Sequence, residues 1–400
     1  MNAAGQRKQP QRWPNSTMRN YLDHNATTPV RPDVIKEIAE VMAQVGNPSS
    51  VHADGQAARR RVEVARQQVG RAVCARPEDV IFTSGGTEAL NLALHSVTQS
   101  VPDARLLVSA IEHEAASRTA QHSGHPVEEI PVTSDGVIDL VWLESRLGRW
   151  DESVDGRPVL VLMLANNEIG TVQPVADAAR LVKARDGLAI VDAVQAIGKI
   201  PVDFAGLGVD YMAVSAHKFG GPQGVGALVA ACDAPVVPHH YGGGQEKNRR
   251  AGTLNVAGIA GMGLAIEQAV AELDEFRALS ELRDRMAQAV KAAAPGTIVL
   301  GESAERLPNT LGLAVPGWER TTQVMAMDLA GVSISAGPAC SSGTPKGSRI
   351  GAALGLDQGA ANGVIRVSLG WNSTPDEADA FVTAWTEAYA RIASTLEATA

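Results

Sequence analysis

The sequence is short of the features that mark secreted, membrane-embedded or nucleic-acid-binding proteins. Its 400 residues include only three cysteines, Cys74, Cys232 and Cys340, which are too far apart for a disulfide framework or a metal-ligand pattern. No apolar run approaches the roughly 18 residues that a transmembrane helix needs. The formal net charge of −9, with no long basic patch, argues against a nucleic-acid partner. We therefore expect a protein of the reducing cytoplasm, with no nucleic-acid partner, no membrane partner and no certain metal ligand.

The chain is long enough for two domains, preceded by a polar tail. Residues 1–20 carry four basic residues and no acid. They lack the amphipathic period of a transit peptide, so we expect a flexible tail. The remaining length exceeds what a single core usually holds. We expect a large domain over residues 21–270 and a small domain over residues 271–400, with the first residues after the tail free to pack on the small domain.

Short apolar runs alternate with amphipathic, helix-length segments through the predicted large domain. The predicted strands are 80–83, 105–109, 159–164, 188–192, 210–215 and 224–230, and the predicted helices include 57–73, 88–97 and 175–185. Continuously apolar strands that alternate with helices predict an α/β fold with a mostly parallel sheet. A long helical pattern over 254–294 leads to a smaller α+β domain, with strands near 310–315 and 364–369 and a closing helix after Pro375.

Polar side chains follow five of the predicted strands at the point where each strand ends. The segments are Ser84-Gly85-Gly86-Thr87-Glu88, Glu112-His113-Glu114, Asn166-Asn167-Glu168, Asp192 to Gln195, and the stretch that ends in Lys218. Ligands of an open α/β sheet bind outside the carboxyl ends of its strands. We therefore expect a His, two Asn, an Asp, a Gln and a Lys to surround one crevice.

Lys218 and Asp192 together predict a site for pyridoxal 5′-phosphate (PLP). Lys218 lies where the apolar strand 210–215 runs into a glycine-rich turn, whereas a solvated lysine usually lies on a polar helix face. Such a lysine can hold an aldehyde cofactor as a Schiff base, and a strand-end carboxylate can pair with the pyridinium nitrogen. Each feature alone is weak, because a strand-end Asp or Lys is more often a cap or a surface charge. Their convergence carries the inference.

The segment from Ser84 to Glu88 has the composition of a phosphate-binding turn. Glycines permit a close backbone approach, and the free amides and dipole of the following helix favour an anion. We assign Gly86 and Thr87 to the phosphate, with Ser215 and His217 as further donors. The segment is neither a Walker loop nor GxGxxG, and a plain glycine turn capped by Thr87 is an equal alternative when it is taken alone.

His113, Asn167 and Gln195 are candidates for contact with the cofactor ring. An imidazole that follows an apolar strand can stack on the pyridine face and shuttle protons. The two amides can hydrogen-bond the phenolic oxygen of the cofactor. The alternatives are a structural histidine and amides that cap the turns after their strands.

Cys340 is the predicted nucleophile. It lies among small residues without a hydrophobic period, in a loop over about 335–348 that we expect to be mobile and reachable. A thiol there can attack once it is ionised. Cys74 and Cys232 lie instead in apolar segments that are typical of structural cysteines.

Arg366 alternates with apolar residues on the strand predicted at 364–369. An inward-facing arginine there suits bidentate capture of a substrate carboxylate. An arginine that faces water at the edge of a strand fits the same pattern equally well.

Eight segments of the sequence resemble motifs of the NifS/IscS-type cysteine desulfurases. They are Tyr21-Leu-Asp-His-Asn-Ala-Thr-Thr-Pro29, Gly46-Asn-Pro-Ser-Ser-Val-His52, Phe82-Thr-Ser-Gly-Gly-Thr-Glu88, Asn166-Asn-Glu-Ile-Gly170, Val191-Asp-Ala-Val-Gln195, Ser215-Ala-His-Lys218, Gly242-Gly-Gly-Gln-Glu246 and Arg250-Ala-Gly-Thr-Leu254. The resemblance runs in order from Tyr21 to about Asn372, and together the motifs are highly specific. The loop around Cys340 is long, as in the NifS/IscS group rather than the SufS group. It departs from the family's common Ser-Ser-Gly-Ser-Ala-Cys-Thr-Ser by carrying Pro338, which we expect to stiffen it.

The resemblance implies a fold-type-I PLP-dependent transferase with a mostly parallel seven-stranded sheet, acting as a homodimeric cysteine desulfurase. Such an enzyme removes sulfur from L-cysteine, leaves L-alanine, and passes the sulfur of an enzyme persulfide to an iron–sulfur scaffold or another acceptor protein. By position, it implies Lys218, Cys340 and His113 as catalytic; Gly86, Thr87, His113, Asn167, Asp192, Gln195, Ser215, His217, Lys218 and, from the other subunit, Thr253 as cofactor-binding; Arg366 and Asn167 as substrate-binding; and Cys340 as a candidate iron–sulfur ligand.

Three other functions are compatible with these motifs: a selenocysteine lyase, an aminotransferase-like PLP enzyme, and a PLP-binding sulfur-trafficking partner without turnover. Selenide release does not always need the loop cysteine, so a Cys340 variant separates the first from a desulfurase. The coherent settings of both Lys218 and Cys340 weigh against the last.

Overall fold

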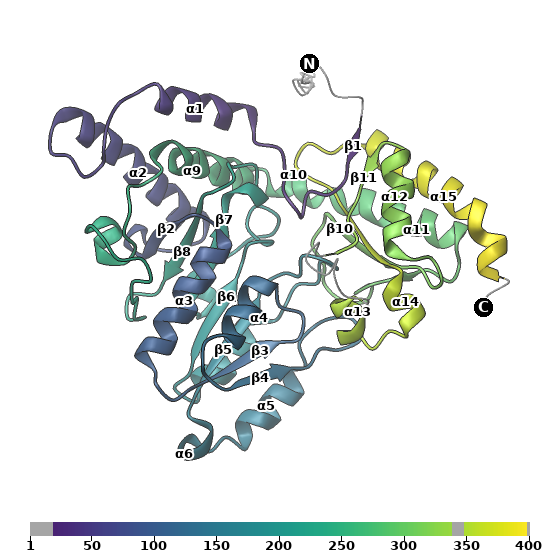
Figure 1. The fold of residues 1–400 in the computed structure, drawn as a ribbon, viewed down its shortest axis with the longest axis horizontal. Helices are drawn as coiled ribbons and strands as arrows, with labels where there is room; N and C mark the ends of the chain where they lie inside the picture. The colour runs from purple at the N-terminus through teal and green to yellow at the C-terminus, as the bar shows by residue number, and fades with distance from the viewer. Residues whose placement is uncertain (1–18, 338–347, 398–400) are drawn as a thin grey trace, which may run out of the picture.

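The computed structural model describes residues 19–337 and 348–397, and its centre is a seven-stranded sheet (Figure 1). In spatial order the strands are β2 (Val80–Thr83), β8 (Gly226–Ala230), β7 (Tyr211–Ser215), β6 (Leu188–Asp192), β5 (Arg157–Met163), β3 (Ala104–Ser109) and β4 (Val127–Ile130). β8 runs antiparallel to both of its neighbours, and the other neighbouring pairs in this sheet are parallel. The predictions of an α/β fold and of a mostly parallel seven-stranded sheet are confirmed.

Helices cover both faces of the sheet. Successive side chains of a strand point to opposite faces, so a strand that is apolar throughout needs a core on each side. Leu160 and Leu162 of β5 point into a core with α2 (Ala53–Ala72), α5 (Leu140–Gly148), α7 (Val175–Lys183) and α9 (Val256–Ala271). Val159 and Val161 point into a core with α3 (Gly86–Ser100) and α4 (Glu114–Gln121). All four strand side chains are at most 1% exposed, which explains why the strand is apolar throughout.

The long helical pattern over 254–294 is broken into three helices. After α9 come α10 (Leu273–Arg277) and α11 (Leu279–Ala293), and the chain bends by 66° at the first break. α9 packs in the large core, whereas Phe276 and Met286 belong to a second core, so one continuous helix would not reach both. Among the described residues no single helix is long and apolar enough to cross a membrane; only α9 taken with its bent continuation passes by length and composition.

The second core is built on a three-stranded antiparallel sheet in the order β12 (Val364–Ser368), β10 (Thr310–Ala314) and β9 (Ile298–Val299). α11, α12 (Arg320–Leu329) and α15 (Pro375–Glu397) cover it, at the right of Figure 1. Leu22 belongs to this core, and β1 (Asn20–Tyr21) pairs in parallel with β11 (Val332–Ser333). The first described residues therefore pack on the C-terminal part of the chain before the chain crosses to the large sheet.

Shorter elements connect these parts. They are α1 (Pro32–Met42), α6 (Glu152–Asp155), α8 (Phe204–Leu207), α13 (Arg349–Ala353), α14 (Gln358–Asn362) and the 3₁₀ turns η1 (Pro77–Asp79), η2 (Ala216–Lys218) and η3 (Gln245–Asn248). The edge strand β4 was not predicted, because its sequence Val-Glu-Glu-Ile shows no apolar alternation.

Cys74 and Cys232 are both exposed, so the expectation that they have apolar, structural settings is wrong. Cys74 follows the end of α2 with a left-handed φ of 53°, and Cys232 follows the end of β8. Each thiol comes just after an apolar run rather than within it. The composition of the neighbouring residues does not distinguish a cysteine inside a buried element from one that follows its end.

Candidate active site

A cavity of about 720 Å³ opens at the carboxyl ends of the strands of the large sheet. The site residues assigned from the sequence all line it, except Thr253 and Cys340. Asp23, Asn25 and Ser335, which were not assigned, also line it. The strand ends therefore converge as expected, and a segment near the N-terminus closes one side.

Lys218 ends the turn η2 directly after β7. Its Nζ donates to the backbone oxygens of Asn25 and Ala26, the latter at 2.8 Å. Burial, and then the charge of Arg366, lower the pKa of Lys218 to about 8. A substantial fraction of the amine is neutral near neutral pH, and the neutral amine is the form that attacks an aldehyde.

Asp192 is the last residue of β6 and is buried at the cavity floor. Its Oδ1 accepts a hydrogen bond from the Val194 N–H at 2.9 Å. Burial raises the pKa of Asp192, while that bond and the charges of His113 and Lys218 act in the opposite direction. A cationic ring nitrogen in the cavity would offset the penalty of burying this carboxylate, as a pyridinium does.

The turn of Gly85, Gly86 and Thr87 lies beside Ser215, the last residue of β7, and we call these four residues the phosphate cradle. Gly85 has φ 157° and ψ −179°, a conformation that glycine alone adopts readily. A Cβ on Gly86 would lie 2.6 Å from Cγ2 of Val194. The N-cap of α3 is Gly85 rather than Thr87, and within the described chain no side chain caps the first turn of this helix. Its N–H groups are therefore available to an anion.

His113 has the structural role of a helix cap and also lies at the cavity. It is the N-cap of α4, with Nδ1 accepting from the Ala115 N–H at 3.0 Å. The exposed imidazole also lines the cavity, which leaves Nε2 for a ligand. His217 lines the cavity near the cradle, and burial lowers its pKa to about 4, so it is neutral at physiological pH.

Asn167 and Gln195 do not simply cap the turns after their strands. The turn after β5 is capped by Asn166, whose Oδ1 accepts from the backbone N–H groups of Glu168 and Ile169. The Asn167 and Gln195 side chains both line the cavity. Each amide is therefore placed where it can contact a ligand.

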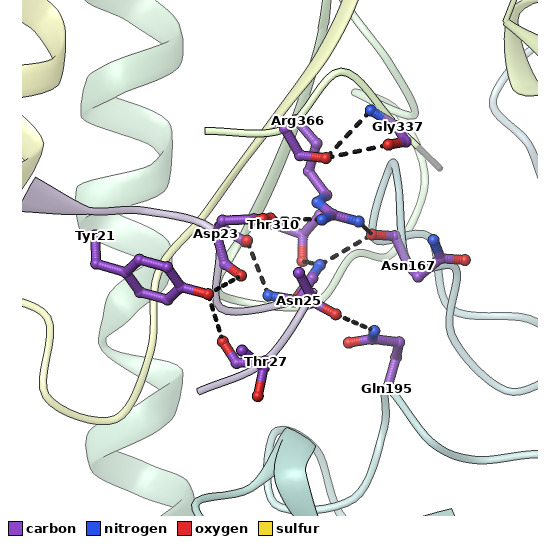
Figure 2. Close-up of polar contacts among 12 residues, drawn as sticks. Tyr21, Asp23, Asn25, Thr27, Asn167, Gln195, Thr310, Gly337 and Arg366 are labelled. Atoms are coloured by element: carbon purple, nitrogen blue, oxygen red, sulfur yellow. Dashed lines mark hydrogen bonds and ion pairs between the residues drawn. The ribbon is translucent and has the colours of Figure 1, made fainter. Parts of the chain in front are cut away.

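Arg366 projects from β12 into the cavity (Figure 2). Its Nη2 pairs with Oδ1 of Asp23 at 2.6 Å, and its Nη1 donates to the backbone oxygen of Asn167 at 2.9 Å. Its Nε is buried and has no partner among the described residues. The side chain is 6% exposed, so the alternative of a strand-edge arginine facing water is wrong.

Thr253 and Cys340 are not placed in this cavity. Thr253 lines a separate cavity of about 110 Å³ that shares Ser84 and Gly224 with the main one. It is exposed, in a loop that is tied to α3 by the ion pair of Arg250 with Glu88. Cys340 lies outside the described residues.

Comparison with known proteins accounts for this arrangement of residues. The family model described as aminotransferase class-V matches residues 20–381. The chain belongs to the class-V aminotransferase family. It is 38% identical over 372 residues to an IscS-like cysteine desulfurase of Mycobacterium tuberculosis, a match that covers 90% of this chain and 93% of the relative.

Solved structures agree with this class-V aminotransferase assignment. A NifS-like protein superposes with a TM-score of 0.86 at 35% identity, over 93% of this chain and all of that one. A structure described as SspA in complex with cysteine superposes with a TM-score of 0.76 at 25% identity, over 89% of this chain and all of that one. The expected resemblance to NifS/IscS proteins and the expected fold-type-I architecture are confirmed.

Class-V aminotransferases are PLP-dependent, which confirms the predicted cofactor. The cavity of this chain also fits it. A low-pKa lysine, a buried carboxylate and a glycine turn with free amides match an aldehyde, a pyridine nitrogen and a phosphate respectively.

Asn25, which the sequence pattern did not single out, joins the two parts of this class-V site. Its Nδ2 donates to the Asn167 backbone oxygen and to Thr310 Oγ1, and its own backbone oxygen accepts from Gln195 and Lys218, as Figure 2 shows in part. Asn25 lies inside the quoted Tyr21–Pro29 motif, but it follows no predicted strand, so local pattern gave no reason to select it.

Glu112 was also missed as a site residue. It is buried beside the floor of the cavity, and its Oε1 accepts from the Met163 N–H at 2.6 Å. Its Oε2 is buried without a partner among the described residues. Burial, and then the charge of Asp192, raise the pKa of Glu112 well above its usual range.

Proposed function

We propose that this protein is a PLP-dependent cysteine desulfurase that removes sulfur from L-cysteine, leaves L-alanine and carries the sulfur as a persulfide on Cys340. The observation that carries the proposal is one cavity in which the amine of Lys218, the carboxylate of Asp192 and the guanidinium of Arg366 meet. The curated relative named as an IscS-like cysteine desulfurase and the SspA structure that holds cysteine support the choice of substrate.

Different residues of the cavity would hold different parts of PLP. Lys218 would hold the aldehyde covalently, Asp192 would face the ring nitrogen, and the phosphate cradle together with His217 would hold the phosphate. His113 would lie against the ring, and Gln195 and Asn167 near its phenolic oxygen. When bound, PLP withdraws electrons from the substrate, which weakens the bonds at Cα and then the carbon–sulfur bond.

Arg366 is the group suited to bind the substrate. Its guanidinium lines the cavity in a plane fixed by Asp23 and the backbone oxygen of Asn167, which suits the α-carboxylate of an amino acid. With substrate bound, the amine of Lys218 would be the group placed to take the α-proton, because its pKa of about 8 is close to physiological pH. His113 is the second group that can move a proton at this side of the cavity.

The sulfur transfer balances without an external oxidant. The thiolate of Cys340 attacks the substrate sulfur, a sulfur–sulfur bond forms as the carbon–sulfur bond breaks, and the electron pair left on carbon takes up a proton to give alanine. Carbon is reduced and the two sulfurs are oxidised to the same extent. A reductant or an acceptor protein is needed only to take the sulfur off the enzyme.

The test supplies the purified protein with PLP, L-cysteine and a reductant, and measures alanine and sulfide. We expect equal amounts of both, and we expect Cys340→Ser to lose both while it still binds PLP. Cys232→Ser, which alters an exposed cysteine, is the matched control and keeps full activity. Full activity of Cys340→Ser would refute the role of Cys340, and transfer of an amino group to a keto acid in place of desulfuration would refute the proposed reaction.

We further expect a homodimer in which Thr253 of each subunit reaches the phosphate bound by the other. Thr253 is exposed and lies behind the phosphate cradle of its own chain rather than in the cavity. Mixing a Thr253→Ala variant, which should bind PLP more weakly, with an inactive Lys218→Ala variant would then restore one complete site per hybrid dimer, with the PLP affinity of the wild type. The iron–sulfur scaffold or other sulfur acceptor, a cluster ligand role for Cys340 and a cytoplasmic location stay predictions.

A further inference from the structure

A second lysine, Lys199, lies in the same region and has no part in the mechanism above. It is 4% exposed, and its Nζ donates to Oδ1 of Asn25 at 2.8 Å and to Oε1 of Gln195 at 2.5 Å. Both partners are neutral amides rather than carboxylates. A buried lysine is costly unless it is discharged or paired with a negative charge. Its role therefore differs from that of an ion-pairing cation.

The state of this amine follows from its surroundings. Burial, and then the charges of Lys218 and Arg366, lower the pKa of Lys199 well below its usual value. Its N–H groups donate to two amide oxygens, one on Asn25 and one on Gln195.

These two donations decide which way each amide points. An amide has an oxygen that accepts and a nitrogen that carries two hydrogens. Because Lys199 donates to the oxygen of Gln195, the Nε2 of Gln195 lies toward the Asn25 backbone oxygen, to which it donates at 2.9 Å. One hydrogen of that Nε2 remains for an acceptor in the cavity that Gln195 lines.

The same logic fixes Asn25. Its Oδ1 accepts from Lys199 and from Asn309 Nδ2 at 3.0 Å, so its Nδ2 faces Asn167 and Thr310 and donates to both. The backbone oxygen of Asn167 accepts from Nδ2 of Asn25 and also from Nη1 of Arg366. We call Asn25, Gln195, Lys199, Asn309 and Thr310 the Asn25 network.

We propose that Lys199 is a positioning residue: it sets the orientation of the Gln195 and Asn25 amides, so that Gln195 presents an N–H to the phenolic oxygen of bound PLP and Asn25 supports the carbonyl that holds Arg366. This inference deepens the proposed function and rests on it. Lys199 acts through these two amides and not by touching the substrate.

The experiment titrates the visible absorbance band of the PLP-loaded enzyme with pH. The phenolic oxygen of bound PLP is negatively charged, and an N–H donor stabilises that charge. Lys199→Met frees the Gln195 amide to turn, so the titration midpoint should rise by about half a pH unit or more. Lys36→Met, at an exposed lysine, is the matched control and should leave the midpoint unchanged.

A double-mutant cycle separates this role from a merely structural one. If Lys199 acts through Gln195, the shift caused by Lys199→Met disappears in a Gln195→Ala background, whereas a loss of general stability persists in both backgrounds. An unchanged midpoint in Lys199→Met, or an equal shift with and without Gln195, would overturn the proposal. Should Lys199→Met fail to fold by circular dichroism, Lys199→Gln retains one donor group and carries the same test, with a smaller shift expected.

The outcome is also separable from a failure of the proposed function. If the wild-type protein develops no visible band with PLP, the cofactor assignment fails. If it develops the band and Lys199→Met titrates like the wild type, only the role of Lys199 fails.

Discussion

The two ends of the cavity are built in opposite ways. In the phosphate cradle, the first turn of α3 has no side-chain cap among the described residues, and the backbone turns through a conformation reserved for glycine. In the Asn25 network, amide and amine groups are used on one another within the protein. The phosphate cradle offers free hydrogen-bond donors to a ligand, whereas most donors of the Asn25 network are already bonded within the protein.

This difference separates binding from positioning. Free donors at a helix N-terminus stabilise an anion that arrives from solution. Donors that are satisfied inside the protein add rigidity, because turning any one amide would leave several buried groups without partners. We therefore expect substitutions in the cradle to lower the affinity for PLP. Substitutions in the network should instead lower the stability of the fold and disturb the position of Arg366.

The largest effect is expected where both ends meet, at Lys218. Lys218→Ala removes the covalent link and a proton-moving group, so turnover should fall by about 10³-fold or more. Borohydride treatment followed by mass spectrometry should find PLP attached to the wild type and not to the variant. The Lys36→Ala control should retain both properties, and a labelled Lys218→Ala protein would place the anchor at another lysine.

A large effect is also expected at Arg366. Arg366→Met loses a charge-assisted contact of about 3 kcal/mol with the substrate carboxylate, so KM for L-cysteine should rise by about 100-fold. The PLP affinity of the cradle should stay close to that of the wild type. Arg285→Met, which breaks an exposed ion pair with Asp379, is the control. A change in PLP affinity with an unchanged KM for L-cysteine would show that Arg366 serves the cofactor rather than the substrate.

The rate at which the apoprotein captures PLP should depend on pH through Lys218. Its pKa is lowered from 10.5 to about 8, so the neutral amine, which attacks, becomes abundant at lower pH than for a surface lysine. The capture rate should therefore rise about tenfold per pH unit up to about pH 8 and level off above it. Stopped-flow absorbance measures this rate, and a plateau only above pH 10 would show an unperturbed amine.

The smallest effects separate the cradle from the network directly. Ser215→Ala should weaken PLP binding by about fivefold, roughly one hydrogen bond, with an unchanged melting temperature of the apoprotein. Asn25→Ala should instead lower the free energy of unfolding of the apoprotein by about 2–4 kcal/mol, because it leaves buried amides unpaired. Calorimetry and PLP titration of both variants test this contrast, and the opposite pattern would break it.

Much of the large sheet could be predicted from sequence because its signal is local. β2 and β6 begin and end where the apolar runs do, and the polar residues after the strands meet at one edge of the sheet. β4 could not be found in this way, because it is an edge strand of four residues in which Glu128 and Glu129 separate the two apolar residues. The break after α9 was missed because the helical pattern of the sequence continues across it, although its two sides serve different cores.

The sequence by itself determined the α/β sheet, the lysine and carboxylate at its strand ends, and the glycine turn before α3. Each of these depends on neighbouring residues, through side-chain period, apolar runs and backbone conformation. Only the tertiary structure decided that Asn25 would meet Thr310, 285 positions away, and Lys199, 174 positions away. Hydrogen bonds across such separations depend on how the two cores pack together, and no local pattern records that packing.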